Sequence, residues 1–283
     1  MRGSIIIPAH NEEQLLPMCL ESLARQPGID EFEIIVVVNG SHDRSAEVAH
    51  SVAPRLPGLR VLETPIAGKS QALNLGETHA TALPRIYLDA DIALSQGAVE
   101  NLISTLTTDQ ALVAAPQIRF DTTDSDTIVR RFYEIYRRLP YVAQGLVGLG
   151  VYAVSRAGRE RFDTFPDIMA DDLFVQRLFS ADERVTVAGE FVVRAPRRWR
   201  DLLAVRIRAA QGARELAATV PIPDMDAATT STSSAHALFG LIRQHPRLLP
   251  AAVIYAGLTL AAQGSARFSR PRWHRDDSSR QAS

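Results

Sequence analysis

Short runs of β-branched residues alternate with segments of helical periodicity through the first half of the chain. The runs lead into Pro8, Asn39 and Asp89, and the segments between them carry apolar residues three and four positions apart. The run 32–38 is apolar on both faces, as a strand covered by helices must be. Strands that alternate with helices predict an α/β fold with a mostly parallel sheet and right-handed crossovers.

The second half is less regular. We expect helices over 128–138, 171–179 and 199–218, and a hairpin from the short apolar runs 185–187 and 191–193. In the first half, Ser95 is expected to cap the helix that follows it.

Ligands of open parallel sheets bind beyond the carboxyl ends of the strands. That rule selects three polar segments that follow predicted strands, namely 8–12, 39–43 and 89–91. We therefore expect the functional site at this edge of the sheet.

Two acidic pairs are the sharpest candidates for chemistry. Asp89 and Asp91 follow a predicted strand, and carboxylates in that position suit Mg²⁺ or Mn²⁺ together with phosphate oxygens. Asp171 and Asp172 open a predicted helix, where one can act as a general base. Each pair also has a purely structural explanation, as a turn former or as a partner of free helix N–H groups.

Lys69 follows a glycine at the start of a predicted helix, where a lysine and free amides can meet a phosphate. A solvated surface lysine is the alternative. The glycine spacing of a P-loop is missing, and no serine hydrolase, zincin or Cys-x-x-Cys motif occurs. The net charge of -1 shows none of the basic excess typical of nucleic-acid-binding proteins.

Four segments, in this order, resemble the family 2 glycosyltransferases, which have the GT-A fold. They are IIIPAHNEE at 5–13, VVVNGSHD at 36–43, GKSQALNLG at 68–76 and LDAD at 88–91. The stretch ADDL at 170–173 looks like the family's Glu-Asp-x-Leu segment. The resemblance implies a Rossmann-like, mostly parallel mixed sheet flanked by helices, with C-terminal helices.

The resemblance also implies a reaction: metal-dependent, inverting transfer of a single sugar, a hexose, from a nucleoside-diphosphate sugar to an acceptor hydroxyl. Asp172, beside Asp171, would be the base, and Asp91 with Asp89 would hold Mg²⁺ or Mn²⁺. Contacts to the donor would fall on Pro8, Ala9, Asn11, Glu12, Asn39, Lys69, Asp89 and Ala90.

Two departures from the family pattern bear on specificity. Asn39 replaces the acid that often contacts the nucleobase, which leaves the nucleotide open. The segment 205–209 lacks the Gln and Trp of the processive members, which favours single transfer. Two other readings remain: a retaining GT-A transferase of the glucosyl-glycerate type, and a nucleotide-sugar-binding module without catalysis.

The expected domain organisation follows from these segments. A catalytic domain would span 1–220, with a nucleotide-sugar half at 1–118 and an acceptor half at 119–220. After it we expect a flexible linker at 221–235, a helical segment at 236–264 and a disordered tail at 265–283.

The apolar stretch 248–262 is flanked by arginines. It fits a helix packed on its own protein or on a second copy, or a peripheral contact with anionic lipid. The single cysteine, Cys19, suits a reducing compartment. We therefore expect a cytoplasmic protein, with attachment at the inner face of the membrane as the alternative.

Overall fold

The computed structural model describes residues 1–107, 112–143, 149–168, 170–219 and 232–268. The chain divides into two compact units. Unit 1 consists of Met1–Arg119 and Val147–Val192, and unit 2 consists of Phe120–Leu146 and Val193–Ser283. Every residue predicted to carry chemistry belongs to unit 1.

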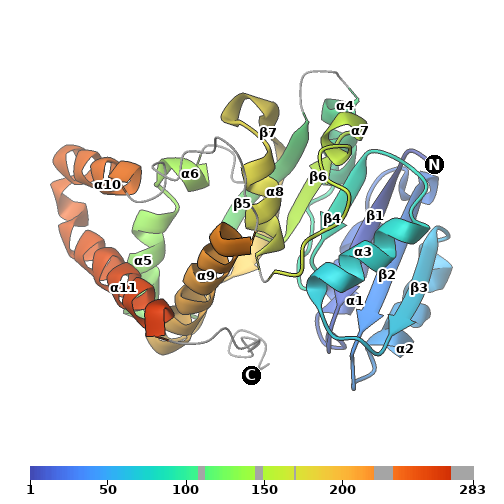
Figure 1. The fold of residues 1–283 in the computed structure, drawn as a ribbon, viewed down its shortest axis with the longest axis horizontal. Coiled ribbons are helices and arrows are strands. Elements are labelled where there is room, and N and C mark those ends of the chain that lie inside the picture. The colour runs from blue at the N-terminus through green and yellow to red at the C-terminus, as the bar shows by residue number, and fades with distance from the viewer. Residues whose placement is uncertain (108–111, 144–148, 169, 220–231, 269–283) are drawn as a thin grey trace. The chain divides into compact units, whose positions relative to one another are not determined.

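A seven-stranded sheet has the order β3-β2-β1-β4-β6-β5-β7 (Figure 1). The first four strands of the chain pair in parallel, and β6 is antiparallel to both β4 and β5. The predicted mostly parallel mixed sheet is confirmed. Its strands are β1 (Gly3–Ala9), β2 (Phe32–Asn39), β3 (Leu59–Thr64), β4 (Arg85–Leu88), β5 (Val113–Asp121), β6 (Val151–Val154) and β7 (Arg184–Arg194).

Helices connect the strands of unit 1 and form most of unit 2. Those of unit 1 are α1 (Leu16–Ala24), α2 (Ser45–Val52), α3 (Lys69–His79), α4 (Ala98–Leu106), α7 (Arg156–Arg159) and α8 (Asp171–Leu178). Those of unit 2 are α5 (Thr127–Tyr136), α6 (Pro140–Ala143), α9 (Trp199–Thr219), α10 (Thr232–Gln244) and α11 (Leu249–Phe268).

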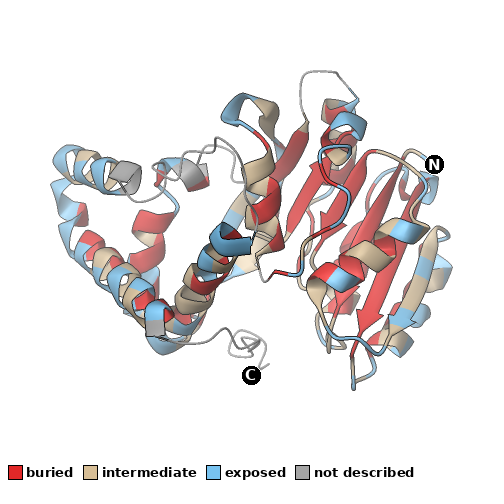
Figure 2. Cartoon of the chain, viewed as in Figure 1, coloured by how far each residue is buried: buried red, intermediate tan, exposed pale blue. Residues whose placement is uncertain are grey.

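The core of unit 1 is built on β1 and β2, in which every residue is buried (Figure 2). Helix α3 lies close against β1, because a Cβ atom at Gly76 would come within 2.5 Å of the Ile6 side chain. The missing side chain therefore sets the distance between α3 and the sheet, and with it the position of the first residue of α3, Lys69.

Unit 2 is held together by aromatic packing. The Phe132 ring of α5 lies 5.1 Å from the Tyr255 ring of α11, and the Arg206 guanidinium of α9 lies 5.1 Å from the Tyr136 ring. The helical stretch Pro246–Arg267 is long and apolar enough to cross a membrane by length and composition, and 33% of its apolar window is buried.

Several predicted boundaries were wrong. The segment expected as a hairpin is the single strand β7, because Gly189 takes a φ of 105° inside the strand instead of closing a turn. Ser95 does not cap α4, since its hydroxyl accepts a hydrogen bond from Glu190 N (2.7 Å) and the helix begins after Gly97.

The C-terminal boundaries also shift. Residues 232–235, expected to end the linker, belong to α10, and 265–268, expected in the tail, belong to α11. The rest of the predicted linker and tail lies outside the described residues.

Glu33 accepts four hydrogen bonds that tie β1, β2 and the approach to β4 together. They come from Ser4 Oγ (2.5 Å), Thr81 Oγ1 (2.6 Å), Thr81 N (2.8 Å) and Ala82 N (3.2 Å). Burial raises the pKa of Glu33, but these donors outweigh it and lower the pKa to about 2.

We predict that Glu33→Gln lowers the free energy of unfolding by about 2 kcal/mol at neutral pH, because the amide leaves some of the donors unpaired. The pKa of Glu33 is lower in the folded than in the unfolded protein, so its ionised carboxylate stabilises the fold at pH values above the pKa of the unfolded state. This contribution is lost as the pH falls toward the folded-state pKa of about 2. Urea unfolding should therefore show the difference from wild type shrinking below about pH 4.5. Glu63→Gln, on the exposed side of β3, is the control, and an equal loss in both variants would contradict the assignment.

Candidate active site

The turn after β1 is fixed by side chains from the segment after β2. Asn11 has a φ of 51°, its N–H donates to Ser41 Oγ (3.0 Å), and its Oδ1 accepts from His42 N (2.8 Å). Glu12 N donates to Ser45 Oγ (2.7 Å). The two polar segments that the strand-end rule selected first are thus joined to each other.

Asn39 links three elements at this edge. Its Nδ2 donates to the carbonyl of Ala9 (2.9 Å) and its Oδ1 accepts from Gly68 N (3.0 Å). The side chain is buried, so both ends of the amide are satisfied within the protein. The residue joins the end of β1 to the start of α3.

Lys69 lies between carboxylates from two elements. Its Nζ is 2.7 Å from Asp89 Oδ1, at the end of β4, and 3.1 Å from Asp171 Oδ1, at the start of α8. Asp171 is nearly inaccessible, whereas a third of each of the other two side chains is exposed. The lysine therefore joins the two predicted acidic pairs into one cluster, the carboxylate cluster, formed by Asp89, Asp91, Asp171, Asp172 and Lys69.

Helix α3 also anchors the segment that leads into α8. Asn74 Nδ2 donates to the carbonyl of Phe165 (2.9 Å), and Phe165 N donates back to Asn74 Oδ1 (2.8 Å). One turn earlier, Ser70 Oγ donates to the carbonyl of Ile168 (3.1 Å). These bonds bring the acidic start of α8 to Lys69.

The backbone of Asp89 is held from two sides. Its N–H donates to the carbonyl of Gly150 (2.7 Å), and the Cys19 thiol donates to its carbonyl (3.7 Å). Gly150 has a φ of 114°, and a Cβ atom there would come within 2.6 Å of Ile92. A glycine is therefore needed where the chain enters β6 beside the carboxylate cluster.

The two acids of α8 have different surroundings. Asp171 is buried and paired with Lys69. Asp172 is partly exposed; its Oδ2 accepts from Leu149 N (3.1 Å) and its Oδ1 from Leu173 N (2.9 Å). Of the two, Asp172 is the acid that is more accessible to solvent.

The carboxylate cluster holds four carboxyl groups around one ammonium. Burial raises the pKa of Asp89 to about 7 and also raises the pKa of Asp171, while Lys69 opposes both shifts. Burial lowers the pKa of Lys69, but Asp171 and Asp89 outweigh it, so the pKa lies well above its usual range. One lysine cannot balance four ionised carboxylates, so the arrangement favours either protonation of a carboxyl group or a bound cation.

A divalent cation would suit this group of carboxylates, but the protein would supply only some of its ligands. Among the described residues, no group of three or more His, Cys, Asp and Glu side chains is arranged to hold a metal ion. Mg²⁺ and Mn²⁺ commonly bind through one or two carboxylates, with water and substrate phosphates completing the shell. Asp89 and Asp91 fit a site in which water and substrate complete the coordination shell, and do not fit one formed by protein ligands alone.

The other predicted donor contacts lie at the same edge. Pro8, Ala9 and Ala90 are buried, whereas Asn11, Glu12 and Asp91 are partly exposed. The structure thus gathers all eleven predicted residues at one edge of unit 1. Which of them contact a donor stays a prediction.

Sequence reasoning missed Tyr152, on β6. Its hydroxyl is buried and has no hydrogen-bond partner among the described residues, and burial with the nearby Asp171 raises its pKa well above the usual range. The sequence composition also singles out Lys69. Of the 31 lysine and arginine residues, Lys69 is the only lysine.

Comparison with known proteins gives a family match. Residues 4–163 match the family model described as Glycosyl transferase family 2. A dolichyl-phosphate beta-glucosyltransferase, ALG5A, from Trichomonas vaginalis is 31% identical over 159 residues, which are 52% of this chain and 49% of that protein. The match spans less than half the length of the first curated relatives.

Two solved structures share the fold. The mannosyltransferase PcManGT from Pyrobaculum calidifontis, in complex with GDP-Man and Mn²⁺, has a TM-score of 0.67 at 22% identity and covers 94% of this chain and 87% of its own. Glucosyl-3-phosphoglycerate synthase from Mycobacterium tuberculosis has a TM-score of 0.55 at 22% identity, and the match covers 78% of this chain and 81% of that protein's chain. The Rossmann-like fold expected from the sequence is confirmed by these neighbours.

We predict that Lys69→Met lowers the free energy of unfolding by about 2 kcal/mol, because the two carboxylates lose their shared cation. The double variant Lys69→Met/Asp171→Asn should recover part of that loss, since it removes one of the repelling charges. Urea denaturation at neutral pH measures both.

Arg55→Met is the control, because its ion pair with Glu21 is long (3.7 Å) and exposed and should contribute less than about 0.5 kcal/mol. If Asp171→Asn brought no recovery in the Lys69→Met background, the carboxylates would not depend on the ammonium.

Proposed function

Because this chain belongs to glycosyl transferase family 2, we propose that it transfers a single sugar from a nucleoside-diphosphate sugar to an acceptor hydroxyl, with inversion at the anomeric carbon. The proposal includes a divalent cation, Mg²⁺ or Mn²⁺. The nucleotide, the sugar and the acceptor are left open.

One observation carries the proposal: Lys69 joins the acidic pair at the end of β4 to the acidic pair at the start of α8. A transferase needs two groups near one point, a positive field for the departing diphosphate and a base for the acceptor. Lys69 supplies the first, and a cation held by Asp89 and Asp91 would add to it. The second is supplied by Asp172, the accessible acid of the second pair.

The reaction then divides among the residues. The acceptor oxygen forms a bond to the anomeric carbon while the bond from that carbon to the diphosphate breaks, and Asp172 takes the proton of the acceptor hydroxyl. Asp89 and Asp91 would hold the divalent cation, which would offset negative charge on the leaving diphosphate. Asp171 positions Lys69, and the buried Asn39 holds the start of α3 in place.

Asp172→Asn should reduce kcat at least about a thousandfold, because the amide cannot accept the acceptor's proton, while the thermal shift produced by the donor stays close to wild type. Asp91→Asn should instead abolish the part of that shift that depends on Mn²⁺. The measurements are a transfer assay and thermal shift with nucleoside-diphosphate sugars.

Asp163→Asn, exposed on the segment before α8, is the matched control and should behave as wild type. Full transfer by both Asp172→Asn and Asp91→Asn would end the proposal. Retention of anomeric configuration in the product would refute inversion while leaving sugar transfer intact.

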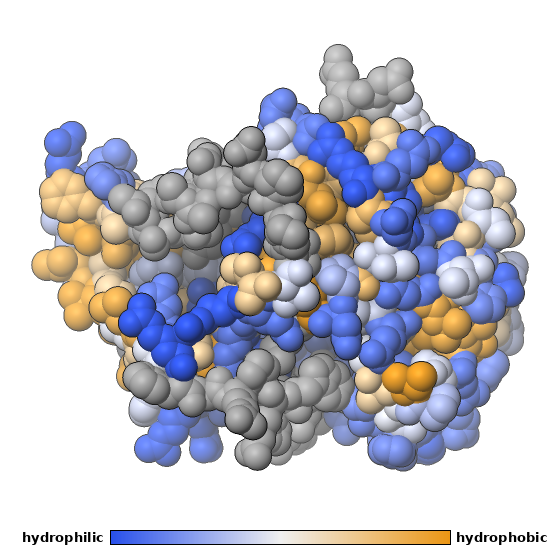
Figure 3. All heavy atoms as spheres, viewed as in Figure 1, coloured by the Kyte–Doolittle hydropathy of each residue, from blue (hydrophilic) through white to orange (hydrophobic). Residues whose placement is uncertain are grey.

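For unit 2, we propose a peripheral contact with an anionic membrane surface in the cytoplasm. Leu249, Val253 and Leu260 of α11 and Phe239 of α10 are more than half exposed, and apolar side chains gather on these helices in the space-filling view (Figure 3). Arg243, Arg247 and Arg267 are exposed at the two ends of this apolar stretch. Apolar contact flanked by arginines suits acyl chains below anionic headgroups.

We predict that Val253→Glu with Leu260→Glu reduces co-sedimentation with phosphatidylglycerol vesicles at least about tenfold, because two charges would enter the acyl region. Ile66→Glu, an equally exposed apolar position in unit 1, is the control. Should the wild-type chain stay in the supernatant and elute as a dimer, α11 would be a protein contact instead.

A further inference from the structure

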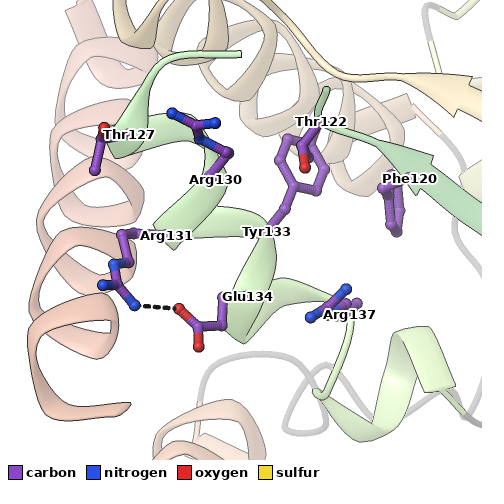
Figure 4. A pocket seen from close by; sticks show the side chains of 8 residues that line it. All are labelled: Phe120, Thr122, Thr127, Arg130, Arg131, Tyr133, Glu134 and Arg137. Atoms are coloured by element: carbon purple, nitrogen blue, oxygen red, sulfur yellow. Dashed lines mark hydrogen bonds and ion pairs between the residues drawn. The ribbon is translucent and has the colours of Figure 1, made fainter. Parts of the chain in front are cut away.

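Unit 2 contains a pocket of about 360 Å³ whose lining comes wholly from one short stretch of chain. That size is near the lower end for small-ligand sites. The lining residues lie on the end of β5, on the connection that follows and on α5 (Figure 4). They are Phe120, Thr122, Thr127, Arg130, Arg131, Tyr133, Glu134 and Arg137.

The pocket has more cationic than anionic groups. Arg131 donates to Glu134 (2.9 Å), and this pair accounts for the one acidic side chain of the lining. Among the described residues, no ion pair or side-chain hydrogen bond engages the guanidinium of Arg130 or Arg137. The close view shows these two arginines on either side of Tyr133 along α5 (Figure 4). Within the part of the chain that the structure describes, these two guanidinium groups of the pocket are thus left without an anionic partner.

The floor of the pocket is aromatic and well fixed. The Phe120 and Tyr133 rings lie 4.9 Å apart, and Tyr133 is buried. Helix α5 is held at its start by Asp126, which accepts from Val129 N (2.9 Å) and from Trp199 N (2.8 Å). The arginines thus project from a rigid support, which reduces the entropy that binding would cost.

We propose that this pocket binds a phosphate ester. Guanidinium groups hold phosphate oxygens through paired, charge-assisted hydrogen bonds. A phosphate monoester carries two negative charges, which two guanidinium groups can balance, whereas a carboxylate carries only one. The hydroxyls of Thr122 and Thr127 add donors at the rim, and the aromatic floor accepts the carbon skeleton of the ester. The ester can be a soluble phosphorylated metabolite or the headgroup of a phospholipid. The proposal does not rest on the transferase function.

The test uses the full chain without divalent cations and in EDTA, so that the metal-dependent donor site stays silent. Two probes separate the sources of the phosphate: glycerol 3-phosphate, measured by calorimetry, and vesicles of phosphatidylcholine with phosphatidic acid, measured by co-sedimentation. The test variant is Arg130→Gln/Arg137→Gln. The control is Arg25→Gln/Arg60→Gln, which removes two exposed arginines from unit 1 and lowers the net charge equally.

We expect the test variant to lose at least about tenfold in affinity for whichever probe the wild type binds, and the control to stay within about twofold. Binding of glycerol 3-phosphate identifies a soluble ester as sufficient, whereas vesicle binding that Arg130→Gln/Arg137→Gln loses and Val253→Glu/Leu260→Glu keeps identifies the headgroup. Equal affinity in the test variant and the wild type, or no binding of either probe by the wild type, overturns the proposal.

Glu134→Gln provides the opposite readout. It removes the one negative charge of the lining and releases Arg131, so affinity for the same probe should rise several-fold. A merely structural role for the Arg131–Glu134 pair predicts no such gain. Affinity that is unchanged or lower in Glu134→Gln, with normal thermal stability, also counts against the proposal.

Discussion

The position of one ammonium group between two carboxylates determines how unit 1 is organised at its functional edge. Removing a carboxylate from water is costly unless a partner charge is close, and Asp171 is almost wholly removed. Lys69 supplies that charge and at the same time holds Asp89. Three elements that are distant in sequence, namely the start of α3, the end of β4 and the start of α8, therefore converge on one side chain.

The rest of the segment 68–76 serves the same arrangement. Gly68 is tied to β2 through Asn39, Ser70 and Asn74 hold the chain that leads into α8, and Gly76 lets α3 approach β1. Residues along one helix thus hold the end of β2, the segment before α8 and the face of β1 in place. A shift of α3 would therefore disturb all three contacts together.

Much of this could be predicted from the sequence, because strand ends in a parallel sheet must share an edge. The alternation of β-branched runs with helical segments predicted the sheet. The polar residues after Ile7, Val38 and Leu88 predicted the location of the candidate site. Pairing between side chains could not be predicted, since no local pattern states that Lys69 contacts both Asp89 and Asp171. The local rules also failed where tertiary contacts override them, as at Ser95, whose hydroxyl serves β7, and at Gly189, which stays within a strand.

That Lys69 is the only lysine has a practical and a biological consequence. Because there is no second lysine, no other side chain of this protein offers acylating reagents a primary amine. Arginine side chains do not react with these reagents under mild conditions. Because the pKa of Lys69 lies well above its usual range, acetyl phosphate, cyanate or an activated ester would modify this amine only at strongly alkaline pH or after its ion pairs open. Covalent neutralisation there would leave Asp89 and Asp171 without their shared counter-ion, and the rate of labelling would report on how often the two ion pairs open.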